Sequence, residues 1–315
     1  MRREAGILGV LCLSAHLFSP PAALAWSRSG HAAVGLLAER RLSPRVLAQV
    51  HSILGPNVSL ADIASCADGA PEPACGDDFK GDALRKDWHT LSIPAEDSPT
   101  QASLEKYCQG SCVTDKINEL LTLLNRKGAS AKEKRVALIY LVHFVGDLHQ
   151  PLHCVVARRD DGREDRWATQ SMLTFMGWQG TLHWLWDNAI ETVAVEKARS
   201  PRDLLEKLES DMSGKPLAAW TQGDVVSLAA LESFQLSKET ILPDYKRNAG
   251  RELGEDYRRK MIPVAYERLE KAGVRLAYLL NGALSAGTAP AQDGKRQEAA
   301  RGRIQGLLDG AQKPQ

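Results

Sequence analysis

Two segments of the chain place an aspartate four residues after a histidine. The pairs are His143 with Asp147 and His183 with Asp187. A spacing of four keeps two side chains on one face of a helix. The other residues of both segments are mostly apolar, so both helices should be buried. Because an unpartnered buried carboxylate is costly, each aspartate must be protonated, ion-paired or bound to a metal ion.

The two pairs predict a metal site between helices. His153 lies beyond Pro151, which ends the first helix because its ring cannot continue the hydrogen-bond ladder. This third histidine is close enough to turn back toward the same place. Imidazole nitrogen and carboxylate oxygen favour Zn²⁺, with Mn²⁺ and Fe²⁺ as alternatives that spacing alone does not separate.

Helical periodicity dominates the chain, and no stretch alternates clearly enough to predict a strand. The most hydrophobic helix is expected over residues 131–150 and carries the first pair. Residues 67–99, rich in Pro, Gly and Asp, are expected to be mostly loop, and Thr114 is a candidate helix cap. Together the elements predict one all-α domain. The other helices are expected over residues 29–43, 44–54, 115–126, 181–197, 201–213, 225–241 and 257–284.

The first 25 residues have the pattern of a secretory signal peptide. Arg2 and Arg3 precede an apolar run too short to span a bilayer, and Ala23-Leu24-Ala25 supplies a small-x-small cleavage site. Cleavage would make Trp26 the first residue of a secreted or periplasmic protein. Residues 26–284 would form the folded domain, and residues 285–315, with little periodicity, a mobile tail.

Composition limits the classes of function. The 315 residues are 43% hydrophobic, which predicts a folded domain with a sizeable core and excludes wholesale disorder. The 40 basic and 39 acidic residues leave a net charge of +1, which excludes a broad basic groove for nucleic acid.

Export permits disulfides, and Cys12 would leave with the signal peptide. Cys108 and Cys112 surround a short flexible turn, and Cys66 and Cys75 flank a Pro-rich loop. Each pair is a candidate disulfide. Cys154 is expected to remain a buried free thiol.

The residues around both histidine–aspartate pairs resemble the zinc-dependent single-strand-specific nuclease family, whose fold is shared with bacterial zinc-dependent phospholipase C. The resemblance runs through residues 26–281 and is strongest over 137–153 and 182–187, with weaker support at 64–68, 231–233 and 272–277. It implies that residues 26–284 form a single mainly helical nuclease domain of this type. Three zinc ions would lie in a cleft between its helices.

The resemblance also implies a ligand for each ion, position by position. Asp68, His89, His143 and Asp147 would hold one zinc, and His153, His183 and Asp187 a second. Trp26, through its α-amine and carbonyl oxygen, would hold the third with His31 and the shared Asp147. The amine binds only when free and deprotonated, so this site should mature after the signal peptide is removed.

A close metal pair suggests the mechanism. Two zinc ions that share Asp147 would bridge a water, lower its pKa toward neutrality and direct hydroxide at phosphorus. Asp68 and Asp147 are therefore the predicted catalytic carboxylates. The expected activity is endonucleolytic cleavage of single-stranded DNA and RNA to 5′-phosphorylated products, with 3′-nucleotidase activity as a further expectation. We expect a monomer without stable membrane insertion.

Aromatic side chains are candidates for stacking on nucleobases. Trp178, between Gly177 and Gly180, is the one expected to be most exposed. The complete candidate set is Trp88, Trp167, Trp178 and Trp184.

Several positions depart from the family pattern. Cys66 stands where the family commonly has Trp, and Pro71 and Ser92 replace an Arg and an acidic residue linked to the transition state. Residues 160–165 replace a usual Gly-Gly-Asn stretch. Two alternatives therefore stay open. One is a phospholipase C, although that branch typically has Glu at the position of Asp187, and the other is a degenerate metal-binding member.

Overall fold

The computed structural model describes residues 26–70, 72–76, 79, 81, 86–108, 111–189, 200–248 and 251–285. The predicted signal peptide, Pro71 and residues 286–315 of the predicted tail lie outside this description. Across the described ranges, no helix is both long and apolar enough to cross a membrane.

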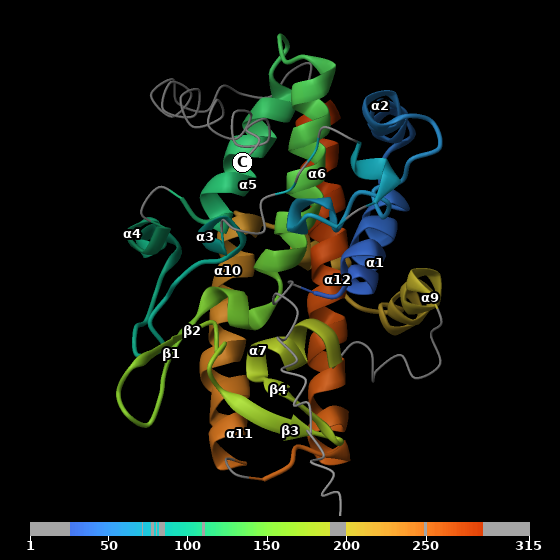
Figure 1. Ribbon diagram of the computed structural model, residues 1–315. Helices are drawn as coiled ribbons and strands as arrows, with labels where there is room; N and C mark the ends of the chain where they lie inside the picture. Colours follow the sequence, from blue (N-terminus) through green and yellow to red (C-terminus); the bar gives the residue numbers. More distant parts are fainter. Residues whose placement is uncertain are drawn as a thin grey trace, which may run out of the picture.

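The described residues are mainly helical, which confirms the predicted fold class (Figure 1). Short 3-10 turns add η1 (Cys66–Asp68) and η4 (Pro151–Cys154), and π-helical segments cover Leu185–Ala189 and Ser237–Ile241. The α-helices are α1 (Arg28–Glu39), α2 (Pro44–Leu54), α3 (Lys86–His89), α4 (Glu105–Cys108), α5 (Val113–Asn125), α6 (Ala131–Leu148), α7 (Leu182–Trp184), α9 (Pro201–Asp211), α10 (Val225–Leu236), α11 (Leu242–Arg247) and α12 (Glu255–Ser285).

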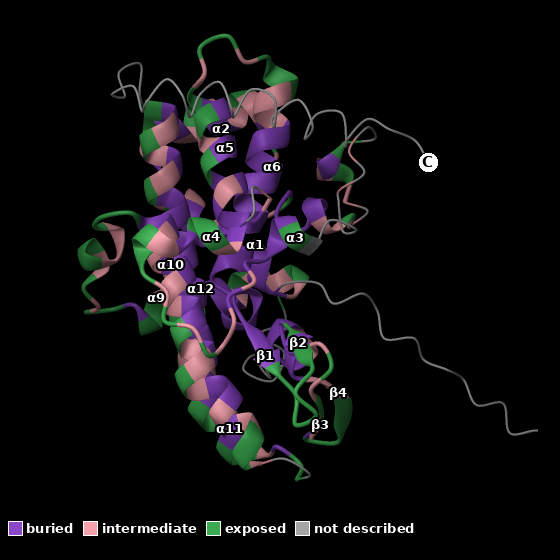
Figure 2. Ribbon diagram, turned by 90° about the vertical axis from the view of Figure 1, so that its left-hand side faces the viewer, coloured by how far each residue is buried: buried purple, intermediate pink, exposed green. Residues whose placement is uncertain are grey.

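Helix α6 is the centre of the domain. It begins at a capping box, in which Ser130 and Glu133 satisfy each other's backbone N–H groups. Every residue from Val136 to Leu148 is buried. Helices α1, α2, α5, α10 and α12 all pack against it, and buried residues gather where these helices meet (Figure 2). The polar side chains between Val136 and Leu148 are thus enclosed on all sides.

A buried network of charges holds α10 and α12 against the end of α6. The Arg275 guanidinium lies 2.8 Å from Glu232, which also pairs with Arg268, and Arg268 donates to the carbonyl oxygen of His149. His149 donates from Nδ1 to a main-chain carbonyl, and burial lowers its pKa. His149 therefore has a structural role and is not one of the predicted ligands.

Two short antiparallel hairpins contradict the prediction of no strands. They are β1 (Val156–Arg158) with β2 (Glu164–Arg166), and β3 (Met172–Phe175) with β4 (Trp178–Thr181). Strands of three or four residues are too short to show a period of two. Met176 and Gly177 form the second turn with φ of 46° and 83°, as a tight hairpin requires.

Several helix limits also differ from the prediction. Cys112, not Thr114, precedes the first residue of α5, and its side chain makes no cap hydrogen bond. Helix α7 passes into a π-helical segment that ends at Ala189, and residues 190–199 lie outside the description. The helix that begins at Val225 continues through a second π-helical segment into α11.

Both predicted disulfides are present, Cys66–Cys75 and Cys108–Cys112. Cys154 is a buried free thiol, as predicted, and burial raises its pKa to about 12. The first disulfide begins in η1, the turn that ends at Asp68. It therefore constrains the backbone beside a predicted ligand.

Candidate metal centre

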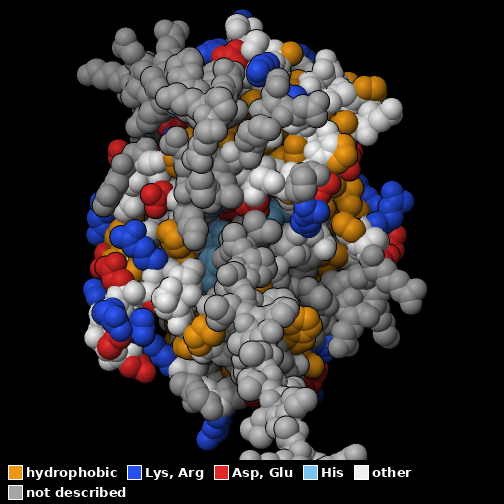
Figure 3. Space-filling view, viewed as in Figure 1, with side chains coloured by type: hydrophobic (Ala, Val, Ile, Leu, Met, Phe, Trp, Pro, Cys, Tyr) orange, Lys and Arg blue, Asp and Glu red, His pale blue; other side chains and the backbone are white. Residues whose placement is uncertain are grey.

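All nine predicted ligands lie in the described part of the chain, and the structure gathers the side chains of the eight histidines and aspartates into adjoining groups. Histidine side chains are visible in a recess in the middle of one face, beside acidic atoms (Figure 3). The positions come from α1 (His31), η1 (Asp68), α3 (His89), α6 (His143 and Asp147), η4 (His153), α7 (His183) and the π-helical segment after it (Asp187), with Trp26 just before α1.

The first group consists of Asp68, His89, His143 and Asp147. His89 Nδ1 lies 2.8 Å from Asp147 Oδ2 and 3.1 Å from His143 Nε2. His143 Nε2 lies 3.2 Å from Asp147 Oδ2 and 3.2 Å from Asp68 Oδ1, and His89 Nδ1 is 3.8 Å from that same oxygen. A tetrahedral zinc ion with bonds of about 2.0–2.1 Å separates its ligands by about 3.3 Å. The ligand atoms of Asp68, His89 and His143 therefore fit a zinc ion, and Asp147 Oδ2 lies within reach of the same ion beside both histidines.

The second group consists of His153, His183 and Asp187. His183 Nε2 is 3.2 Å from Asp187 Oδ2, and the two imidazole rings stack with centroids 5.1 Å apart. His153 Nε2 and Asp187 Oδ2 are buried without a hydrogen-bond partner among the described residues. Since buried polar atoms are normally paired, these atoms indicate a cation that would bind them.

The third group centres on His31. Its Nε2 lies 3.4 Å from Asp147 Oδ1, and neither atom has a hydrogen-bond partner in the described part of the chain. Trp26 is fully buried and its Nε1 donates to the carbonyl oxygen of Gly146 at 3.0 Å, which brings residue 26 beside Asp147. The two oxygens of Asp147 therefore face different groups, as a carboxylate shared between two ions must.

Three of the histidines are oriented by main-chain carbonyl groups that accept a hydrogen bond from Nδ1. In the neutral ring that binds a metal, this arrangement leaves Nε2 with its lone pair toward the group. The partners are Ala64 for His143 (2.8 Å), Trp167 for His183 (2.7 Å) and His89 for His153 (3.2 Å). The carbonyls themselves have no sequence signal, because any residue can supply one.

Electrostatics differ between the groups. Burial lowers the pKa of His153 to about 4 and raises the pKa of Asp187 well above its usual value. For Asp147, burial is outweighed by the charge of His143, which holds the carboxyl pKa well below its usual range. A bound dication would stabilise the ionised form of the buried Asp187 carboxyl.

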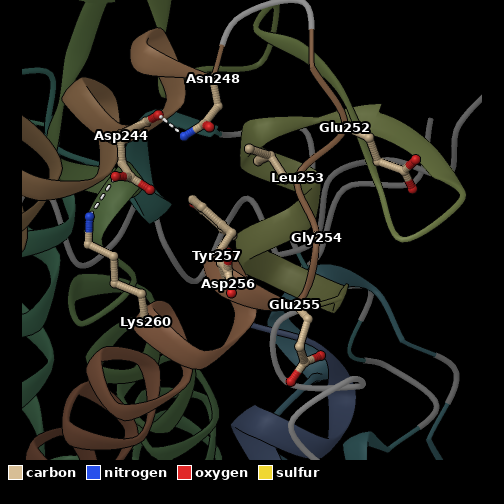
Figure 4. A pocket seen from close by; sticks show the side chains of 9 residues that line it. All are labelled: Asp244, Asn248, Glu252, Leu253, Gly254, Glu255, Asp256, Tyr257 and Lys260. Atoms are coloured by element: carbon tan, nitrogen blue, oxygen red, sulfur yellow. Dashed lines mark hydrogen bonds and ion pairs between the residues drawn. The ribbon is translucent and has the colours of Figure 1, made fainter.

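Other candidates in the molecule fit a metal site less well. Cys108, Cys112 and Asp115 also lie close together, but the disulfide removes both thiolates. A cavity of about 460 Å³ near the start of α12 contains none of the predicted site residues (Figure 4). Its walls carry Asp244, paired with Lys260, and several exposed acidic side chains.

The candidate stacking residues differ in how far they are exposed. Trp178 is 62% exposed, as predicted, and its ring stacks on Trp184, whose neighbour in the chain is His183. Trp88 and Trp167 are buried. The exposed ring of Trp178 thus stacks on the residue that follows a ligand of the second group in the chain.

The fold and the site together define a class: a helical domain that gathers histidines and aspartates for divalent cations between its helices. The sequence model of the S1/P1 Nuclease family matches residues 26–285, and the chain belongs to that family. This confirms the family predicted from the motifs.

Curated relatives agree with this assignment. Endonuclease 4 of Arabidopsis thaliana is 26% identical over 289 residues, covering 82% of this chain and 89% of its own. Nuclease S1 of Aspergillus oryzae is 27% identical over 282 residues, covering 81% and 91%. Nuclease P1 of Penicillium citrinum is 29% identical over 215 residues, covering 64% and 74%.

Proposed function

We propose that this protein is an exported zinc-dependent endonuclease that cleaves single-stranded DNA and RNA to 5′-phosphorylated products. As a member of the S1/P1 nuclease family it is a hydrolase of phosphodiester bonds. The observation that carries the metal-dependent mechanism is Asp147, whose two oxygens face two different groups of buried ligand atoms.

Three zinc ions are proposed, one for each group. When bound, zinc acts as a Lewis acid that lowers the pKa of a water and neutralises phosphate charge. Asp68, His89, His143 and Asp147 would hold the first ion, and His153, His183 and Asp187 the second. Trp26, His31 and Asp147 would hold the third.

The protein's own residues supply position and charge. Asp147 fixes the distance between the first and third groups, because one carboxylate belongs to both. The histidines offer Nε2 or Nδ1 in fixed directions, since their rings are buried and several are anchored through the other nitrogen. Asp68 completes the carboxylate pair that we assign to catalysis.

We attribute substrate binding to aromatic rather than basic side chains. Trp178 and Trp184 form a stacked pair, and Trp184 follows His183 in the chain. Base stacking on such a pair is sequence-tolerant and needs unstacked bases, which favours single strands. The net charge of +1 fits a compact site in which the cations supply the positive charge.

The decisive assay compares four substrates with one preparation beginning at Trp26: single-stranded DNA, single-stranded RNA, duplex DNA and a short-chain lecithin. We expect chelator-sensitive cleavage of both single strands. His143→Ala should lower the rate at least about 100-fold, whereas His51→Ala, on α2, should not. Faster release of phosphocholine would favour the phospholipase alternative, and no hydrolysis with zinc bound would favour the degenerate one.

The role of Trp26 has a separate test. An extra Met before Trp26 removes the free amine at that residue, so we expect one zinc ion fewer per chain and lower activity. Three zinc ions and full activity in that protein would refute the role. Mass spectrometry of the exported protein would test the cleavage site.

A further inference from the structure

Gln150 lies between the end of α6 at Leu148 and the start of η4 at Pro151, between ligands of different groups. It is fully buried, with 0% of its surface exposed. In the sequence it lies between the predicted ligands Asp147 and His153, and the motif itself assigns no role to its amide. In the structure all four of its polar groups are hydrogen-bonded.

The direction of the Gln150 amide follows from its partners. The backbone N–H of Leu152 can only donate, so the side-chain atom 2.6 Å from it is the carbonyl oxygen. The NH₂ group therefore points the other way, where it donates to Asp187 Oδ1 at 2.6 Å. This orientation needs no assumption about the site itself.

The donation leaves the two oxygens of Asp187 unequal. Oδ1 accepts from the amide, whereas Oδ2 is buried, has no hydrogen-bond partner among the described residues and lies 3.2 Å from His183 Nε2. A carboxylate held in this way offers one oxygen in a fixed direction. Without the amide, rotation of the carboxyl would exchange or tilt the two oxygens.

The backbone of Gln150 connects the same ligands. Its N–H donates to the carbonyl oxygen of Asp147 at 2.9 Å, and its own carbonyl oxygen accepts from the N–H of His153 at 3.0 Å. One residue thus contacts Asp147 of the first and third groups and both His153 and Asp187 of the second. Of the three groups, its side chain is hydrogen-bonded only to the second.

We infer that Gln150 is a positioning residue for the second metal group, holding Asp187 so that Oδ2 alone is presented to the ion. The inference rests on the proposed zinc site. It predicts that loss of the amide lowers the affinity for one ion and leaves the affinities for the other two unchanged. Removing a group that orients a ligand typically lowers metal affinity about 10–100-fold.

The test is Gln150→Met, which keeps the length of the side chain and removes the amide. Zinc content and competition with a chelator should show one ion of three bound about 10–100-fold more weakly. The matched control is Gln235→Met, because the amide of Gln235 also donates to a carboxylate, Glu239, but on the exposed side of α10. The control should bind zinc like the unmodified protein.

His183→Ala separates failure of the inference from failure of the proposed site. If it loses one ion while Gln150→Met keeps three at unchanged affinity, the inference is overturned and the site stands. If His183→Ala itself binds as much zinc as the unmodified protein, the site and the inference both fail. Equal weakening of all three ions in Gln150→Met, with a lower Tm of the metal-free protein, would show a structural role and also overturn the inference.

Discussion

Replacing Gly146 with alanine should remove the third zinc ion and leave the other two. Gly146 precedes Asp147 in α6 and faces the ring of His31. A Cβ at Gly146 would lie 2.6 Å from His31 Nδ1 and 2.8 Å from its Cε1. An ordinary contact begins at 3.4 Å, so the ring would have to move by about 0.8 Å to restore one.

The size of the effect can be worked from this contact. Overpacking a well-packed interior costs about 1–3 kcal/mol. Alanine in place of glycine within a helix stabilises the folded protein by up to about 1 kcal/mol. The free energy of unfolding of the metal-free protein should therefore fall by no more than about 3 kcal/mol. Metal binding should suffer far more, because ligand distances are tolerated only within about 0.2 Å.

The assay is zinc content per chain after equilibration with a chelator, together with thermal unfolding of the metal-free protein. Gly282→Ala is the matched control: it also lies near the end of a helix, and nothing stands within 4 Å of its added Cβ. We expect two ions in Gly146→Ala and three in Gly282→Ala. Three ions at unchanged affinity in Gly146→Ala would refute the assignment of His31 to a metal group.

Three further predictions follow from other contacts. Replacing both Cys66 and Cys75 by alanine should weaken the ion held by Asp68, measured by chelator competition, whereas the same change at the second disulfide should leave zinc content unchanged. Glu232→Gln should lower the free energy of unfolding in urea by about 2 kcal/mol, because two guanidinium groups lose their carboxylate partner. Those groups hold the pKa of Glu232 below its usual value against burial, so its stabilisation is complete above the unfolded-state pKa and is lost in acid. If the free energy of unfolding of Glu232→Gln fell in acid as steeply as that of the unmodified protein, this explanation would be contradicted. Cys154, with a pKa of about 12, should react with iodoacetamide at pH 8 only as fast as the protein unfolds; rapid labelling of the folded protein would contradict its burial.

Local sequence was enough to predict the central helix. The apolar residues of 131–150 leave no polar face, and α6 is accordingly buried from Val136 to Leu148. The four-residue spacing of His143 and Asp147 predicts that they share a face, and their ligand atoms lie 3.2 Å apart. The two hairpins were not predictable in this way, because strands this short are stabilised by their turns and by contacts such as that of Phe175 with Leu253.

The sequence by itself determined which residues could bind metal and which helices would be buried, since residue type and helical spacing are local properties. Only the tertiary structure decided how those residues meet. Asp147 divides its oxygens between two groups, Gly146 leaves room for His31, and Gln150 directs Asp187. Each of these relations joins atoms that lie far apart in the chain, so distance and direction appear only when the helices pack.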